Sequence, residues 1–163
     1  MPVLTRPALA PLARRAAVGA VVLVLALAGC GGQQVADNRG SIDFELVKIL
    51  TETAVGGMIS PGAVALADPA AVAQWNAQFT NQRMPETIAE FADDLAIPDG
   101  QAAYAAVVGI GCDLPSGVSV ISTDSGILIE PVESTAEPVQ CYAPMTMVAI
   151  VLVDTEAVAP AAG

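Results

Sequence analysis

The 163-residue chain contains no histidine, and that absence excludes several kinds of functional site. Ser-His-Asp and Cys-His catalytic arrangements use an imidazole as general base, and many zinc and haem sites use it as a ligand. Basic residues are scarce as well, since six Lys and Arg face seventeen Asp and Glu, for a formal net charge of -11. A surface of that sign repels phosphate backbones, so we expect no nucleic-acid partner.

The composition nevertheless indicates a folded protein. Hydrophobic residues make up 54% of the chain, which is too many for a disordered acidic segment. The length suits one domain and is too short for two. We expect a single folded domain over residues 41–155.

Half of the basic residues lie at the N-terminus. Arg6, Arg14 and Arg15 precede an uncharged run, AAVGAVVLVLALAG, over residues 16–29. A helix that spans a bilayer needs roughly 20 apolar residues, so this run is short for a permanent anchor. A basic leader, a short apolar segment and small residues before a cleavage site predict a secretory signal peptide over residues 1–29.

The expected cleavage site carries a specific motif. Leu27-Ala28-Gly29-Cys30 resembles the lipobox of bacterial lipoproteins. The resemblance implies that Cys30 receives a diacylglycerol on sulfur, becomes the first residue after cleavage and attaches the protein to the cell membrane on its exported face. Each buried acyl CH₂ contributes about 0.8 kcal/mol, so two or three chains anchor stably. The alternative is an ordinary signal peptide with an accidental cysteine.

The residue after Cys30 bears on which membrane holds the anchor. Gly31, and not an aspartate, follows the cysteine. By analogy with lipoprotein sorting, this is compatible with delivery to the outer membrane in a host with two membranes, and equally with a one-membrane host. Residues 30–40 lack apolar periodicity and predict a flexible tether, and the Pro/Ala-rich residues 156–163 predict a disordered tail.

The two remaining cysteines suggest a disulfide. Cys112 ends the apolar run AYAAVVGIG, and Cys141 precedes the run YAPMTMVAIVLV, so both lie at the ends of expected strands. In an exported domain such cysteines are expected to be oxidised. The alternatives are a redox pair or a metal site, but the Cys-x-x-Cys spacing that is usual for a redox pair is absent.

The first half of the expected domain combines a strand with short helices. Apolar and acidic residues alternate from residue 42 until Val47 breaks the phase, which favours a strand but leaves a short helix possible. Asp68-Pro69 predicts a helix start, and Val72, Trp75 and Phe79 are spaced as one apolar helix face. A second short helix is expected from Pro85 to Phe91. A further short extended piece is expected over residues 63–67.

The second half is expected to be β-structure. Residues 104–110 form an interior strand, and residues 118–122 and 127–132 flank the turn Thr123-Asp124-Ser125-Gly126 as a hairpin. The nine residues 145–153 contain one polar side chain and predict a central strand that is buried on both faces. Together these elements predict an α+β fold, in which one or two short helices pack on a small antiparallel sheet of four or five strands.

No catalytic or metal-binding arrangement is evident, and no cofactor is expected. Asp93, Asp94 and Asp99 form the densest acidic group but lack the late glutamate of a calcium loop, which favours a solvated loop. A Ser-Lys dyad would depend on Lys48, the only lysine, without a supporting motif. The glutamates of EPVESTAEP indicate an exposed acidic connection more than a glycosidase pair: Glu130, Glu133 and Glu137.

The single tryptophan has two interpretations. Trp75 at helical spacing is typical of a core residue. Alternatively, an apolar pocket between helix and sheet, with Trp75 and Tyr104 in its wall, would make the domain a ligand-binding or sensing module.

The order of elements resembles the PrcB-like, protease-complex-associated domain of bacterial lipoproteins. The matching segments run from residue 42 to residue 154: FELVKILTETAVGG, PAAVAQWNAQF, YAAVVGIG, the hairpin 118–132 and YAPMTMVAIVLV. Residues 112–118, CDLPSGV, depart from the family's glycine-rich turn that ends in an aromatic residue. The resemblance implies a non-enzymatic module that assists or scaffolds other envelope proteins, and so a protein partner in the cell envelope.

Overall fold

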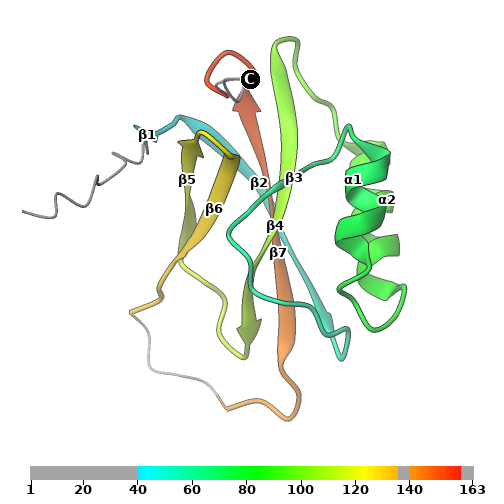
Figure 1. Ribbon diagram of the computed structural model, residues 1–163. Coiled ribbons are helices and arrows are strands. Elements are labelled where there is room, and N and C mark those ends of the chain that lie inside the picture. Colours follow the sequence, from blue (N-terminus) through cyan, green and yellow to red (C-terminus); the bar gives the residue numbers. More distant parts are fainter. Residues whose placement is uncertain (1–39, 136–139, 159–163) are drawn as a thin grey trace, which may run out of the picture. The chain divides into compact units, whose positions relative to one another are not determined.

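The computed structural model describes residues 40–135 and 140–158 and has the expected α+β fold. Two short helices accompany two antiparallel sheets, of three and four strands, where the sequence suggested a single sheet of four or five (Figure 1). The three-stranded sheet has the order β1-β5-β6, and the four-stranded sheet has the order β2-β7-β4-β3. The elements are β1 (Gly40–Ser41), β2 (Phe44–Thr53), β3 (Val64–Ala65), α1 (Pro69–Asn76), α2 (Arg83–Asp94), β4 (Gln101–Gly111), β5 (Gly117–Thr123), β6 (Gly126–Val132) and β7 (Met145–Asp154).

Strand β7 lies inside the larger sheet and is buried on both faces, as its apolar run predicts. Successive side chains of a strand point to opposite faces. Val148 and Ile150 therefore join a helix-side core beneath α1 and α2, whereas Ala149 and Val151 join an inter-sheet core against the β5–β6 hairpin. Figure 1 shows this arrangement, with the helices on one side of β7 and the hairpin on the other.

Two segments pass from one sheet to the other and join the sheets along both sides. At the first, β1 pairs with β5, the amide of Ile42 donates to the carbonyl of Val120 at 3.1 Å, and the chain then pairs with β7 as β2. At the second, the amide of Ala63 donates to the carbonyl of Ile127 in β6 at 2.9 Å, and the chain then pairs with β4 as β3. The strands β1 and β3 at these crossings are only two residues long, and they carry no sequence pattern that predicts them.

The phase break at Val47 is a β-bulge. The register between β2 and β7 shifts between Leu46 and Lys48, so β2 is a strand throughout and the helical alternative is wrong. β2 forms one edge of its sheet. A bulge together with an exposed lysine is a common protection of an edge strand against pairing with another chain.

Helix α1 starts where the sequence predicts but ends before Phe79. The Asp68 carboxylate accepts hydrogen bonds from the amides of Ala70 and Ala71, both at 3.0 Å, and Pro69 is the first helical residue. After Asn76 the chain tightens into turns, in which the Phe79 amide donates to the Asn76 carbonyl at 3.1 Å. Phe79 is therefore a buried residue of the following loop and does not extend the helix face.

Helix α2 begins at Arg83, two residues before the expected start. The side-chain oxygen of Asn81 accepts from the Arg83 amide at 3.0 Å. The Arg83 guanidinium also lies 3.1 Å from the Glu52 carboxylate on β2. Met84 and Ile88 anchor the helix in the helix-side core.

The predicted hairpin is present as β5 and β6. Gly126 has φ +124°, a conformation that side chains rarely adopt, and the Thr123 hydroxyl donates to its carbonyl at 2.9 Å. Within the described residues, no helix is long and apolar enough to cross a membrane.

Candidate functional site: a cleft beside the disulfide

The Cys112–Cys141 disulfide lies where the two longest paired strands meet. Gly111, the last residue of β4, pairs with Met145, the first residue of β7. Cys112 follows at once, and its Cα atom lies 5.5 Å from that of Cys141, within the usual range for a disulfide. The predicted bridge is confirmed. It holds the end of β4 against the start of β7, two strands that the β5–β6 hairpin separates in the sequence. A stable disulfide is consistent with an exported, oxidising location.

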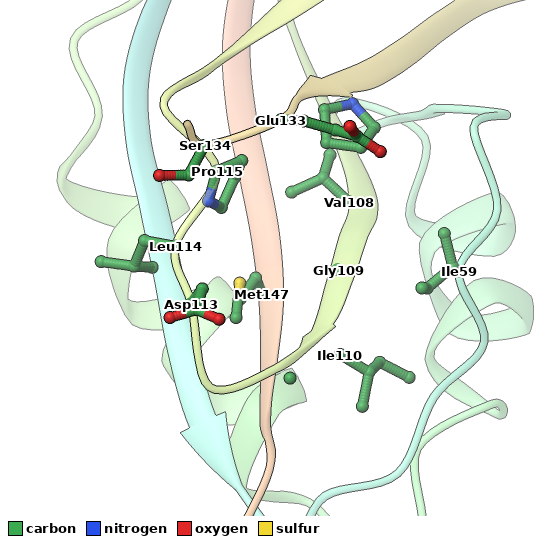
Figure 2. Close-up of a pocket in the computed structure, with 12 residues that line it drawn as sticks. Ile59, Val108, Gly109, Ile110, Asp113, Leu114, Pro115, Glu133, Ser134 and Met147 are labelled. Carbon is green, nitrogen blue, oxygen red and sulfur yellow. The ribbon is translucent and has the colours of Figure 1, made fainter. Parts of the chain in front are cut away.

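A cleft of about 320 Å³ opens beside this bridge, at one end of the inter-sheet core. Val108 and Met147 belong to that core and also line the cleft. In Figure 2, Leu114 and Ile59 lie on opposite sides of the cleft, with Met147 between them. We call this feature the cleft; its lining residues are Ile59, Val108, Gly109, Ile110, Gly111, Asp113, Leu114, Pro115, Pro131, Glu133, Ser134 and Met147.

Gly109 keeps the floor of the cleft open. The register between β4 and β7 shifts between Val107 and Gly109, which marks a bulge in β4 at this point. A Cβ atom on Gly109 would lie 3.3 Å from the Met147 sulfur, so a side chain here would compete with Met147 for space. The bulge and the glycine together shape the cleft.

Three exposed apolar side chains line the cleft. Of the eight large hydrophobic residues that the described structure exposes, three line the cleft, two are chain neighbours of lining residues, and one follows Cys141. Leu114 is 51% exposed and Ile59 is 59% exposed. An exposed apolar cluster of this kind is typical of an interaction site. We call the three lining residues the apolar rim: Ile59, Ile110 and Leu114.

Hydrogen bonds hold the two loops that form one side of the cleft. The Ser116 hydroxyl lies 3.1 Å from the carbonyl oxygens of both Val132 and Glu133 and donates to them. The Ser116 amide also donates to the Val132 carbonyl at 3.0 Å. Together with the disulfide, these contacts fix the loop that carries Asp113 and Leu114.

The charged residues of the cleft are acidic. Asp113 and Glu133 are among its lining residues, which include no lysine or arginine. Over residues 40–135 and 140–158, Lys48 and Arg83 are the basic residues against fifteen acidic ones, and Arg83 pairs with Glu52. The cleft is therefore an apolar concavity in a strongly negative surface.

The other candidate residues from the sequence do not come together. Asp93 and Asp94 end α2, whereas Asp99 lies in the loop that follows, and Lys48 lies on the edge strand β2. Within the described ranges, no group of three or more His, Cys, Asp or Glu side chains could hold a metal ion. Glu137 and the expected lipid-attachment residue Cys30 lie outside the described residues.

Trp75 and Tyr104 do not share a pocket. Trp75 packs against the helix-side core, in edge-to-face contact with Phe79 at a centroid distance of 5.3 Å. Tyr104 packs against the inter-sheet core, on the other face of β4. A separate cavity of about 350 Å³ is lined by Trp75 with Asp68, Gln74 and Ala71 of the α1 region and by residues 62–65.

No family model, no curated protein and no solved structure matches the chain. The resemblances to lipoproteins and to the PrcB-like domain therefore stay predictions. The sequence did not predict the cleft, because Ile59 and Leu114 are far apart in the sequence and line the same cleft only in the folded chain.

Proposed function

We propose that the chain is a lipid-anchored protein of the bacterial cell envelope whose domain binds a partner protein and has no catalytic role. The observation that carries this proposal is the apolar rim of the cleft, since three of the eight exposed large hydrophobic residues of the described structure line it. Apolar side chains that remain in water after folding favour binding of a second apolar surface. The disulfide and the Ser116 hydrogen bonds keep this surface preorganised, which lowers the entropy cost of binding.

The membrane anchor is proposed from the motif that ends at Cys30 and agrees with a disulfide-bonded, exported domain. Replacing Cys30 with serine should release the protein from membranes or leave an uncleaved precursor, while thermal unfolding of the domain stays unchanged. Membrane fractionation detects the release, and the intact mass of the protein identifies an uncleaved precursor. A Cys30→Ser protein that stays in the membrane fraction at the mass of the processed wild type contradicts the anchor.

The docking role is tested by co-purification with matched variants. The wild-type chain, Leu114→Ser in the apolar rim and Ile97→Ser as a control are expressed at equal levels, and bound envelope proteins are compared by quantitative mass spectrometry. Ile97 is 43% exposed but lies outside the cleft. We expect one set of proteins to bind the wild type and Ile97→Ser and to be lost with Leu114→Ser. Equal recovery with all three chains contradicts docking at the cleft.

A second candidate function is small-ligand binding, favoured by the cavity of about 350 Å³ beside Trp75. This volume lies at the lower end of the range for small-molecule sites, roughly 300–1,000 Å³. Trp75 is the only tryptophan of the chain, so a ligand that binds in this cavity should shift its fluorescence. A saturable shift on titration with members of a small-molecule library supports the candidate, and an unchanged spectrum throughout contradicts it.

A further inference from the structure

We infer that the segment bound in the cleft pairs an apolar side chain with a neighbouring lysine or arginine, so that the partner presents a basic and apolar peptide. This inference rests on the proposed docking function and names the chemistry of its partner. It follows from the shape of the cleft, from the sign of its charges and from the charge of the surrounding domain.

The apolar part of the recognition comes from the floor and walls of the cleft. Val108 and Met147 form an apolar floor that continues into the inter-sheet core, and Ile59 and Leu114 flank it (Figure 2). At about 320 Å³ the cleft is at the small end of ligand sites. It has room for side chains of an extended segment and not for a whole helix or domain.

The basic part of the recognition comes from the carboxylates. Glu133 lies at one end of the cleft in Figure 2, and Asp113 lies beside Leu114. The lining residues include no cation, and Lys48 and Arg83 of the described chain lie on other elements. A bound lysine or arginine beside the apolar side chain would lie near the Glu133 carboxylate in a domain with an excess of negative charge, which also speeds association.

The same charges argue against two other occupants. A second copy of this chain would bring a second acidic cleft and another acidic domain into contact, and like charges across an interface oppose binding. An anionic lipid leaflet would repel the two acidic residues that line the cleft and the net negative charge of the described domain. A basic peptide meets neither penalty.

The experiment selects peptides from a random library displayed on phage. The full-length lipidated chain is presented in nanodiscs and, separately, in detergent micelles, with empty nanodiscs and micelles used to remove unspecific binders. Selected peptides are then synthesised, and their affinity is measured for the wild type and for paired variants. Leu114→Ser is matched by Ile97→Ser. Glu133→Gln is matched by Asp124→Asn, which removes a carboxylate at the other end of the same hairpin.

We expect the selected peptides to carry Lys or Arg next to Leu, Ile, Met or an aromatic residue. Leu114→Ser should weaken their binding about tenfold or more, as loss of a central apolar contact does. Glu133→Gln should weaken it about two- to fivefold, the effect of one partly exposed ion pair. Ile97→Ser and Asp124→Asn should leave the affinity unchanged.

The contradictory outcomes separate the inference from the proposed function. Leu114-dependent peptides that are neutral or acidic would overturn the basic partner and leave docking at the cleft intact. A selection that yields no Leu114-dependent peptide would overturn docking itself. Leu114-dependent binding in micelles that disappears in nanodiscs would show that lipid covers the cleft, and a Leu114-dependent dimer in sedimentation would show that a second copy does. Either of the last two results overturns the inference.

Discussion

Removing the Cys112–Cys141 disulfide should destabilise the domain strongly without unfolding it at room temperature. The bridge closes a loop with a sequence separation of 29 residues. In the chain-entropy model, a loop of that length restricts the unfolded state by about 3.6 kcal/mol at 25 °C. For a domain of this size, that loss corresponds to a fall in melting temperature of about 15 °C.

The structure explains why the fold should survive this loss. β4 and β7 remain paired from Gln101 to Gly111, and their side chains fill both cores. The amide and hydroxyl of Ser116 still hold the loop beside the cleft. The native contacts are therefore largely independent of the bridge, and its effect acts mainly on the unfolded chain.

The assay is urea unfolding of the full chain in micelles, followed by Trp75 fluorescence and circular dichroism. The double variant Cys112→Ser/Cys141→Ser should lose about 3–4 kcal/mol of unfolding free energy. Wild type that has been reduced with dithiothreitol should match it, and dithiothreitol should not affect the double variant. A loss below about 1 kcal/mol would refute the argument, because it would mean that the unfolded chain gains little freedom when the bridge is removed.

Two further substitutions test how the helices are held. Asp68→Ala removes the carboxylate that accepts hydrogen bonds from the amides of Ala70 and Ala71, and it should lower the free energy of unfolding in urea by about 1 kcal/mol. Asp68→Asn keeps an acceptor and should therefore be nearly as stable as the wild type. Equal losses for both variants would contradict the capping role. Met84→Ala truncates a fully buried side chain of the helix-side core and should cost about 2–5 kcal/mol in the same assay. A cost within about 0.5 kcal/mol, typical of surface positions, would show that α2 is not anchored through Met84.

Elements with strong local signals were predictable from the sequence. β7 is a long apolar run, the hairpin has a glycine in its turn, α1 has a capping aspartate followed by proline, and Val47 breaks an alternation where a bulge forms. The position of each cysteine at the end of a strand was enough to predict the bridge. In each case a few neighbouring residues carry the physical cause.

Features that depend on distant residues were not predictable in this way. β1 and β3 are two residues long and are defined as strands by their hydrogen bonds to β5 and β4. The sequence therefore has no local pattern that predicts the division into two sheets. The place of Phe79 depends on turns that follow α1. The cleft combines Ile59 with the segments around Leu114 and Glu133, and an exposed Leu or Ile looks the same in sequence as a buried one.

Site-specific photo-crosslinking tests the central claim most directly, because it records contact at single positions of the anchored protein. A photoreactive amino acid is placed in turn at Ile59, Ile110 and Leu114 in the apolar rim and at Leu46 and Ile97, which are exposed elsewhere. We expect crosslinks to the same partner protein from the three rim positions and none from the two others. Equal crosslinking at all five positions, or crosslinks only at Leu46 and Ile97, would contradict docking at the cleft.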